Sequence, residues 1–140
     1  MKSGRTIIFI FICMLFLSSC TMKAKYKFMH DPSTITKIEI VHIDNIIETK
    51  GVESTTLATI TDTNAFLKDF EALSCYLIYT DPKGIDNGSD VIKITYDNND
   101  YELIDCAGTS KFTSEGGFMH NKGYRYFADE EFSALINKYK

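Results

Sequence analysis

The feature that most constrains the fold is a pair of alternating apolar and polar runs on either side of two asparagines. Val91 to Asp97 and Asp100 to Cys106 both alternate with a period of two, and Asn98-Asn99 separates them. In a strand, that period puts every second side chain on the same face. Asparagine tolerates the positive φ angles of a tight turn. These residues therefore predict a β-hairpin with a two-residue turn.

A two-residue turn also sets the register of this hairpin. It places Tyr96 opposite Tyr101, Ile94 opposite Leu103 and Ile92 opposite Asp105. Cross-strand partners share one face of a sheet, so these pairs are expected to be buried together. The other face is then expected to carry Lys93, Thr95, Glu102 and Ile104.

The rest of the chain predicts further strands and two helices. Strands are expected at Ile35–Asp44, Thr55–Thr61, Cys75–Thr80 and Tyr124–Phe127, with short extended pieces at Phe112–Glu115 and Phe118–His120. One helix is expected from Asp62, a favourable N-cap residue, with an apolar stripe of Phe66, Leu67, Phe70 and Leu73. A second is expected from Asp129, with a stripe of Phe132, Leu135, Ile136 and Tyr139. This order predicts an α+β fold, with two amphipathic helices packed on an antiparallel sheet of about five to seven strands.

The first twenty residues have the composition of an export signal. Lys2 and Arg5 precede an apolar run of eleven residues, Ile7 to Leu17, and small residues follow. A basic start, a short apolar run and small residues are typical of a secretory signal. The run is shorter than the roughly 20 residues of a membrane-spanning helix. An ordinary cleaved signal and a short membrane anchor are the alternatives at this point.

The end of this segment, Leu17-Ser18-Ser19-Cys20, resembles the lipobox of bacterial lipoproteins. The resemblance implies that a signal peptidase recognises Leu17, Ser18 and Ser19, and that Cys20 is diacylated and becomes the new N-terminus. Two acyl chains hold a protein stably at a membrane, whereas one chain holds it only marginally. The resemblance therefore implies a protein anchored to membrane lipid through diacylated Cys20, on the extracytoplasmic face of the cell membrane.

The expected division of the chain follows from that cleavage site. Residues 1–19 are expected to be the signal peptide, residues 20–33 the lipidated cysteine with a basic tether, and residues 34–140 a single α+β domain. The 121 residues that remain after cleavage fit one domain. The tether is assigned because Thr21 to Ser33 shows no periodicity and ends in Asp31-Pro32-Ser33.

Charge is unevenly distributed between these parts. Lys23, Lys25 and Lys27 make the tether basic, whereas residues 34–140 contain ten basic and eighteen acidic residues. A lysine near an anionic membrane is worth about 1 kcal/mol of attraction. The acidic body excludes nucleic acid as a partner, because nucleic acid requires a basic face.

Two cysteines, Cys75 and Cys106, remain in the expected domain. An even number of cysteines in an exported protein raises the question of a disulfide. If the strands follow one another as a meander, these cysteines lie at opposite ends of the sheet, beyond the roughly 7 Å Cα separation that a disulfide allows. A bridge is therefore the less favoured outcome, although a different strand order would remove this objection.

Three groups of residues contain the side-chain types of a metal site or a catalytic site, but their number or spacing does not match such a site. His42 and Asp44 share a strand face that His120 could approach, yet a zinc or copper site needs three or four converging ligands. The loop with Asp81, Asp86, Asn87 and Asp90 does not have the spacing of a calcium loop. Cys106 and His120 lack a third residue that would orient a thiol and its base. No catalytic site, metal site or cofactor is therefore expected.

Four tyrosines, Tyr76, Tyr79, Tyr124 and Tyr126, lie on expected strands. Exposed tyrosines suit contact with protein or glycan, and filling of the core is the alternative. The sequence thus favours a non-catalytic lipoprotein that binds a protein or another envelope component. A lipoprotein that binds a small ligand or a metal ion is the alternative, and a hydrolase-like enzyme is the least favoured class.

Overall fold

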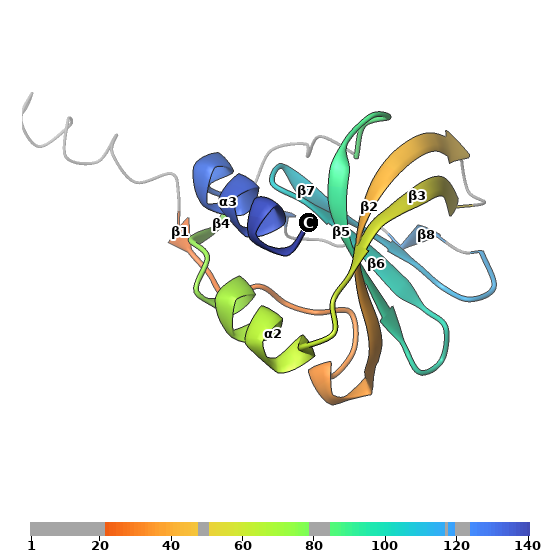
Figure 1. The fold of residues 1–140 in the computed structure, drawn as a ribbon, viewed down its shortest axis with the longest axis horizontal. Helices are drawn as coiled ribbons and strands as arrows, with labels where there is room; N and C mark the ends of the chain where they lie inside the picture. Colours follow the sequence, from red (N-terminus) through yellow and green to blue (C-terminus); the bar gives the residue numbers. More distant parts are fainter. Residues whose placement is uncertain (1–21, 48–50, 79–84, 117, 120–123) are drawn as a thin grey trace, which may run out of the picture.

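The computed structural model describes residues 22–47, 51–78, 85–116, 118–119 and 124–140 (Figure 1). The strands are β1 (Met22–Lys23), β2 (Ile35–Ile47), β3 (Gly51–Thr59), β4 (Cys75–Ile78), β5 (Asp90–Tyr96), β6 (Tyr101–Asp105), β7 (Gly108–Phe112), β8 (Phe118–Met119) and β9 (Tyr124–Phe127). The helices are α2 (Thr63–Glu71) and α3 (Asp129–Tyr139), and a short 3-10 helix, η1, spans Pro32–Thr34. No helix in the described ranges is long and apolar enough to cross a bilayer.

The strands form two antiparallel sheets. The larger sheet has six strands in the order β3-β2-β5-β6-β7-β8, and the smaller has the order β1-β4-β9. Helices α2 and α3 lie beside the larger sheet, and their buried residues belong to one core with residues of β2 and β5 (Figure 1). The expected α+β class is confirmed, as are the antiparallel sheet within the expected range of strands and the two packed helices.

Both faces of the larger sheet bury apolar residues. On the helix-covered face, Ile38, Ile40, Ile92 and Ile94 pack with buried residues of both helices: Phe66, Phe70, Phe132, Leu135 and Ile136. A second cluster joins Val41, Ile43, Val91 and Leu103 with Phe112 and Ile85. Residues of β2 enter both clusters because successive side chains of a strand point to opposite faces.

The first helix begins as the sequence predicts. The Asp62 side chain accepts a hydrogen bond of 2.9 Å from the amide of Ala65, which satisfies one of the exposed donors of the first turn. Helix α3 has no such side-chain cap. Its first turn contains three acidic residues instead, and negative charge is favourable at a helix N-terminus.

The expected register of the β5–β6 hairpin is wrong by one residue. The amide of Tyr96 donates to the carbonyl of Asp100 at 2.9 Å, so the loop between them has three residues, with Asn99 at a φ of 65°. Three-residue hairpin loops commonly end in such a left-handed residue. Ile94 therefore lies opposite Glu102, and Ile92 lies opposite Ile104. The shift moves Glu102 and Ile104 onto the face that the helices cover.

Several element boundaries also differ from expectation. Strand β3 begins at Gly51 rather than Thr55, and β2 continues to Ile47. The extended piece expected at Phe112–Glu115 lies earlier in the chain, as β7 (Gly108–Phe112), and β7 pairs with β6 in the sheet. The meander order assumed for the cysteines is wrong, because β4 pairs with β1 and β9 in the smaller sheet.

The two cysteines lie on either side of one phenylalanine. Cys75 lies opposite Phe127 in the β4–β9 pair, and the amide of Phe127 donates to the carbonyl of Cys106 at 2.8 Å. Cys75 and Cys106 are not joined to each other by a disulfide. Their separation follows from the strand that lies between them.

Candidate functional site

Residues 22–34, here called the N-terminal strap, comprise β1, an irregular stretch and η1, and they run along the domain before β2 (Figure 1). The expectation that residues 20–33 form a tether outside the fold is wrong for residues 22–33, the part of that segment that the structure describes. Met22 and Lys23 pair with β4, and the amide of Ala24 donates to the carbonyl of Cys75 at 2.9 Å. Tyr26 and Phe28 pack against the main core. The strap is therefore built into the domain from Met22 onward.

Aromatic contacts hold the middle of the strap. The Tyr26 ring meets the rings of Phe28 and Phe70 edge-on, with centroid separations of 5.0 and 5.2 Å. It also stacks on Phe127 at 5.8 Å. Aromatic pairs in these geometries contribute about 0.5–1.5 kcal/mol each beyond their buried area. Tyr26 thus connects the strap to both α2 and β9.

The strap also covers a buried carboxylate. Glu102 is fully buried, and Tyr26 and Tyr96 both donate hydrogen bonds to it, the former at 2.8 Å. The Lys111 ammonium lies 3.7 Å from the same carboxylate and donates to the carbonyl of Lys27 at 3.1 Å. A buried charge needs such partners because desolvation is otherwise very costly. Three of the groups that satisfy this site come from the strap itself, because the Met29 amide also donates to Glu102, at 3.4 Å.

The two phenols of this network keep their protons. Burial, reinforced by the Glu102 charge, raises the pKa of the Tyr26 hydroxyl well above its ordinary value. The same two causes raise the pKa of Tyr96. Both phenols therefore remain donors at physiological pH, and every buried side-chain nitrogen or oxygen in the described part of the chain has a hydrogen-bond partner. The network therefore leaves no buried polar side chain of this region without a partner.

A second polar pair secures the end of the strap. His30 Nε2 lies 2.7 Å from Asp100 Oδ2, and the His30 ring meets the Tyr96 ring edge-on. Asp100 also accepts hydrogen bonds from the Ser114 amide and the Asn98 side chain, at 2.8 and 2.9 Å. Burial alone would raise the pKa of Asp100, but these bonds outweigh it and lower that pKa. Asp100 is therefore held as a carboxylate.

Two of the four tyrosines expected to form a surface lie side by side. Tyr76 and Tyr126 are cross-strand partners in β4 and β9, and their rings stack at 5.2 Å. Lys23 lies opposite Tyr76 on the other side, so one row crosses all three strands of the smaller sheet. Neither tyrosine belongs to a core cluster. Tyr124 of β9 is the cross-strand partner of Ile78 of β4, and Tyr79 lies outside the described residues.

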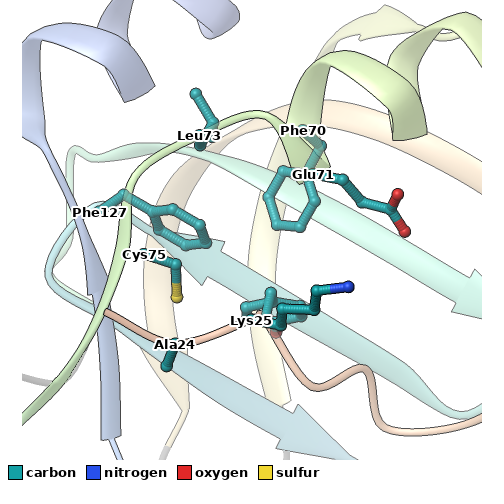
Figure 2. Close-up of a pocket in the computed structure, with 8 residues that line it drawn as sticks. Ala24, Lys25, Phe70, Glu71, Leu73, Cys75 and Phe127 are labelled. Atoms are coloured by element: carbon teal, nitrogen blue, oxygen red, sulfur yellow. The ribbon is translucent and has the colours of Figure 1, made fainter. Parts of the chain in front are cut away.

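A pocket of about 170 Å³ opens between the strap, the end of α2 and the smaller sheet (Figure 2). Phe70, Phe127 and Cys75 form its interior, whereas the side chains of Lys25 and Glu71 extend together to one side (Figure 2). Pockets for drug-sized ligands usually enclose about 300–1,000 Å³. This pocket therefore suits only a small molecule.

Those residues considered for metal binding that the structure describes do not assemble into a site. His42 Nδ1 lies 2.7 Å from Asp90, which also accepts from Lys140 at 2.8 Å. Asp44 instead accepts from Thr55 at 2.8 Å. Within the described ranges, no three His, Cys, Asp or Glu side chains are grouped so as to hold a metal ion. His120 and Asp81 lie outside those ranges, and Asp86 and Asn87 are exposed.

Cys106 does not have the environment of a nucleophile. Burial and the negative charges of Asp105 and Asp129 raise the pKa of its thiol to about 12. Only the thiolate attacks an electrophile, and reactive cysteines have depressed pKa values. The pairing of Cys106 with His120 cannot be described, since His120 is outside the described residues.

The sequence analysis does not predict the hydrogen-bond network between the strap and Glu102, although the sequence contains one signal that the strap belongs to the fold. Lys23, Lys25 and Lys27 alternate with Ala24, Tyr26 and Phe28, which is the period of a half-buried strand. Glu102 was assigned to the wrong face by the one-residue error in register. The lipobox residues Leu17, Ser18, Ser19 and Cys20 lie outside the described residues.

Comparisons with protein-family models, with curated proteins and with solved structures find no match to this chain.

Proposed function

We propose that this chain is a lipoprotein held on the extracytoplasmic face of the cell membrane through diacylated Cys20, and that its domain is a non-catalytic module that binds a protein or another envelope component. The observation that carries the proposal is the strap. Strand β1 begins at Met22, only two residues after Cys20, and the strap is fixed to the core by Tyr26 and Glu102. A lipid at Cys20 would therefore position the whole domain.

The polar groups of the domain favour binding over catalysis. The buried carboxylate of Glu102 is covered by the strap, and the Cys106 thiol has a raised pKa. His42 is engaged by Asp90. Catalytic groups instead have pKa values near the working pH.

The edge of the larger sheet offers a surface for a protein partner. Strand β3 is at the end of the strand order and carries the exposed Leu57, and the neighbouring β2 carries the exposed Ile46. Edge strands can pair with an extended segment of another protein. The hairpin end of β2 and β3 lies at the opposite end of the molecule from β1 (Figure 1). An anchor near β1 would leave this edge accessible.

Acylation of Cys20 provides the decisive test. Cells that express Cys20→Ala should show no incorporation of a labelled fatty acid into the protein and no detergent-phase partitioning, whereas the parent chain shows both. Cys13→Ala is the matched control, because Cys13 lies in the same export segment but outside the lipobox, and it should label like the parent. Labelling of Cys20→Ala at the parental level would refute the proposal.

Binding of a small ligand is the second candidate, and the pocket in Figure 2 favours it. Its aromatic interior and the charges of Lys25 and Glu71 suit a small zwitterion such as a free amino acid. A rise in melting temperature with one amino acid, abolished in Glu71→Ala but kept in Glu130→Ala, would support it. No shift with any member of the set would leave the protein-binding function as the better account.

A further inference from the structure

We infer that the outer face of the smaller sheet, together with the exposed lysines of the strap, lies against anionic lipid headgroups and orients the domain on the membrane. The residues of this membrane-facing surface are Lys23, Lys25, Lys27, Tyr76 and Tyr126. The inference rests on the proposed lipidation of Cys20 and adds to it a defined surface and a defined orientation.

The register of the smaller sheet shows how this surface is built. Cys75 and Phe127 are cross-strand partners, and both are buried in the main core. The next residues along each strand, Tyr76 and Tyr126, must point to the opposite face, because alternate side chains of a strand point oppositely. Lys23 is paired with Tyr76 and is exposed. The row therefore faces away from the core.

The strap extends the same surface with positive charge. Tyr26 and Phe28 pack inward, and the residues that alternate with them, Lys25 and Lys27, are exposed. Residues 34–140 have an excess of eight acidic residues, so this stripe contrasts with the rest of the domain. An anionic leaflet attracts the stripe and repels the acidic body. Charge complementarity thus favours contact between the membrane and the side of the protein that carries these lysines.

The short distance from the acylated residue keeps one end of this surface close to the membrane. Lys23 is three residues from Cys20, a span of at most about 11 Å when fully extended. The headgroup layer on each side of a bilayer is about 5–8 Å thick. A lipid at Cys20 therefore places the Lys23 end of the row at or next to the headgroups.

The chemistry of the row suits that position. Tyrosine is enriched at membrane–water interfaces because its ring is apolar and its hydroxyl is polar. Tyr76 and Tyr126 present two stacked rings beside Lys23. In this orientation, the hairpin end of β2 and β3 points away from the membrane (Figure 1).

Tryptophan fluorescence can test the orientation, because the chain contains no Trp. The processed protein is purified and placed in vesicles of phosphatidylglycerol and phosphatidylcholine whose acyl chains are brominated near the headgroup. Tyr126→Trp should lose emission to bromine, because an interfacial aromatic residue lies at the level of the headgroups. Ile46→Trp, at an exposed position of β2 near the far end, is the matched control and should keep its emission.

A charge variant tests the lysines separately. Replacing Lys23, Lys25 and Lys27 by Gln should weaken quenching of Tyr126→Trp in phosphatidylglycerol vesicles, whereas replacing the exposed Lys37, Lys68 and Lys140 should not. The intact mass shows whether the protein carries the diacylglyceryl group. If it does and the Trp residues at positions 126 and 46 are quenched equally, the orientation is overturned but the lipidation stands. Absence of that group from the intact mass would overturn both. The membrane contact would also be overturned if the emission of Tyr126→Trp were not quenched and the three lysines were instead required for binding to an acidic protein.

Discussion

The hydroxyl of Tyr26 donates a hydrogen bond of 2.8 Å to Glu102, which lies 76 residues further along the chain. Tyr26 belongs to the strap, and Glu102 belongs to β6, within the larger sheet rather than at its edge. This bond therefore joins the first described residues to the interior of the fold. It also brings a carboxylate, two phenols and an ammonium group into one buried network.

Removal of the carboxylate should be costly. Glu102→Ala is expected to lower the free energy of unfolding by about 3–5 kcal/mol, because it leaves the Lys111 ammonium buried without its counter-charge. Urea unfolding of the domain measures this. Adding Lys111→Met to Glu102→Ala should recover much of the loss, since a buried ion pair can be replaced by apolar packing. If the double variant is as unstable as the sum of the single variants, the two residues are not coupled.

Removal of the strap's own hydrogen bond should act locally. Tyr26→Phe is expected to destabilise the protein by about 1–2 kcal/mol, because Glu102 loses one of its donors while the aromatic packing remains. Hydrogen exchange should accelerate at the Ala24 amide more than at amides of β5 and β6. Tyr76→Phe, on the outward row, is the control and should be nearly silent. Uniform acceleration over the whole domain would contradict a local effect.

Acid should weaken the contact at the end of the strap. The folded-state pKa of Asp100 is lowered, so its carboxylate contributes stability above the unfolded pKa, near 4, and loses that contribution as the pH falls through the folded value. Asp100→Asn should therefore reduce stability at pH 7 and flatten its loss below pH 4. Asp97→Asn, at an exposed neighbouring position, provides the comparison. Parallel pH profiles for the parent and Asp100→Asn would contradict this role.

Thiol chemistry should be suppressed in the folded protein. Because the pKa of Cys106 is raised to about 12, its alkylation by iodoacetamide at pH 8 should be at least about a hundredfold slower than in urea. Mass spectrometry of timed samples measures both rates. Asp105→Asn removes an adjacent negative charge and should accelerate the reaction, whereas Asp97→Asn, exposed at the loop end of the β5–β6 hairpin, should not. Rapid alkylation of the folded parent would show that the thiol is activated.

The fold class was predictable because the local signals agree with the packing. Asp62 caps α2, and Phe66 and Phe70 are both buried at helical spacing. Alternation in β5 likewise marks Ile92 and Ile94 as core residues. These patterns depend only on the period of an element and the chemistry of its ends, which a sequence displays directly.

The network at Glu102 was not predictable by the same reasoning. Two asparagines suit a two-residue turn, but Asn99 takes the left-handed conformation at the end of a three-residue loop. The difference of one residue reverses the face of every side chain in β6. Glu102 also contradicts the ordinary rule that charged residues lie outside, and its partners Tyr26 and Lys111 are remote in sequence. Such long-range compensation has no local signature.

The pairing of β1 with β4 has a consequence for release from a cell surface. Proteases preferentially cut exposed segments that lack pairing and packing. In a chain anchored at Cys20, the stretch from Met22 to Phe28 is protected by the Ala24–Cys75 hydrogen bond and by the burial of Tyr26. Cleavage there requires the strap to open first. In such an anchored chain, release of the domain by cleavage within Met22–Phe28 would be limited by local unfolding of the strap, so its rate would follow the stability of the fold.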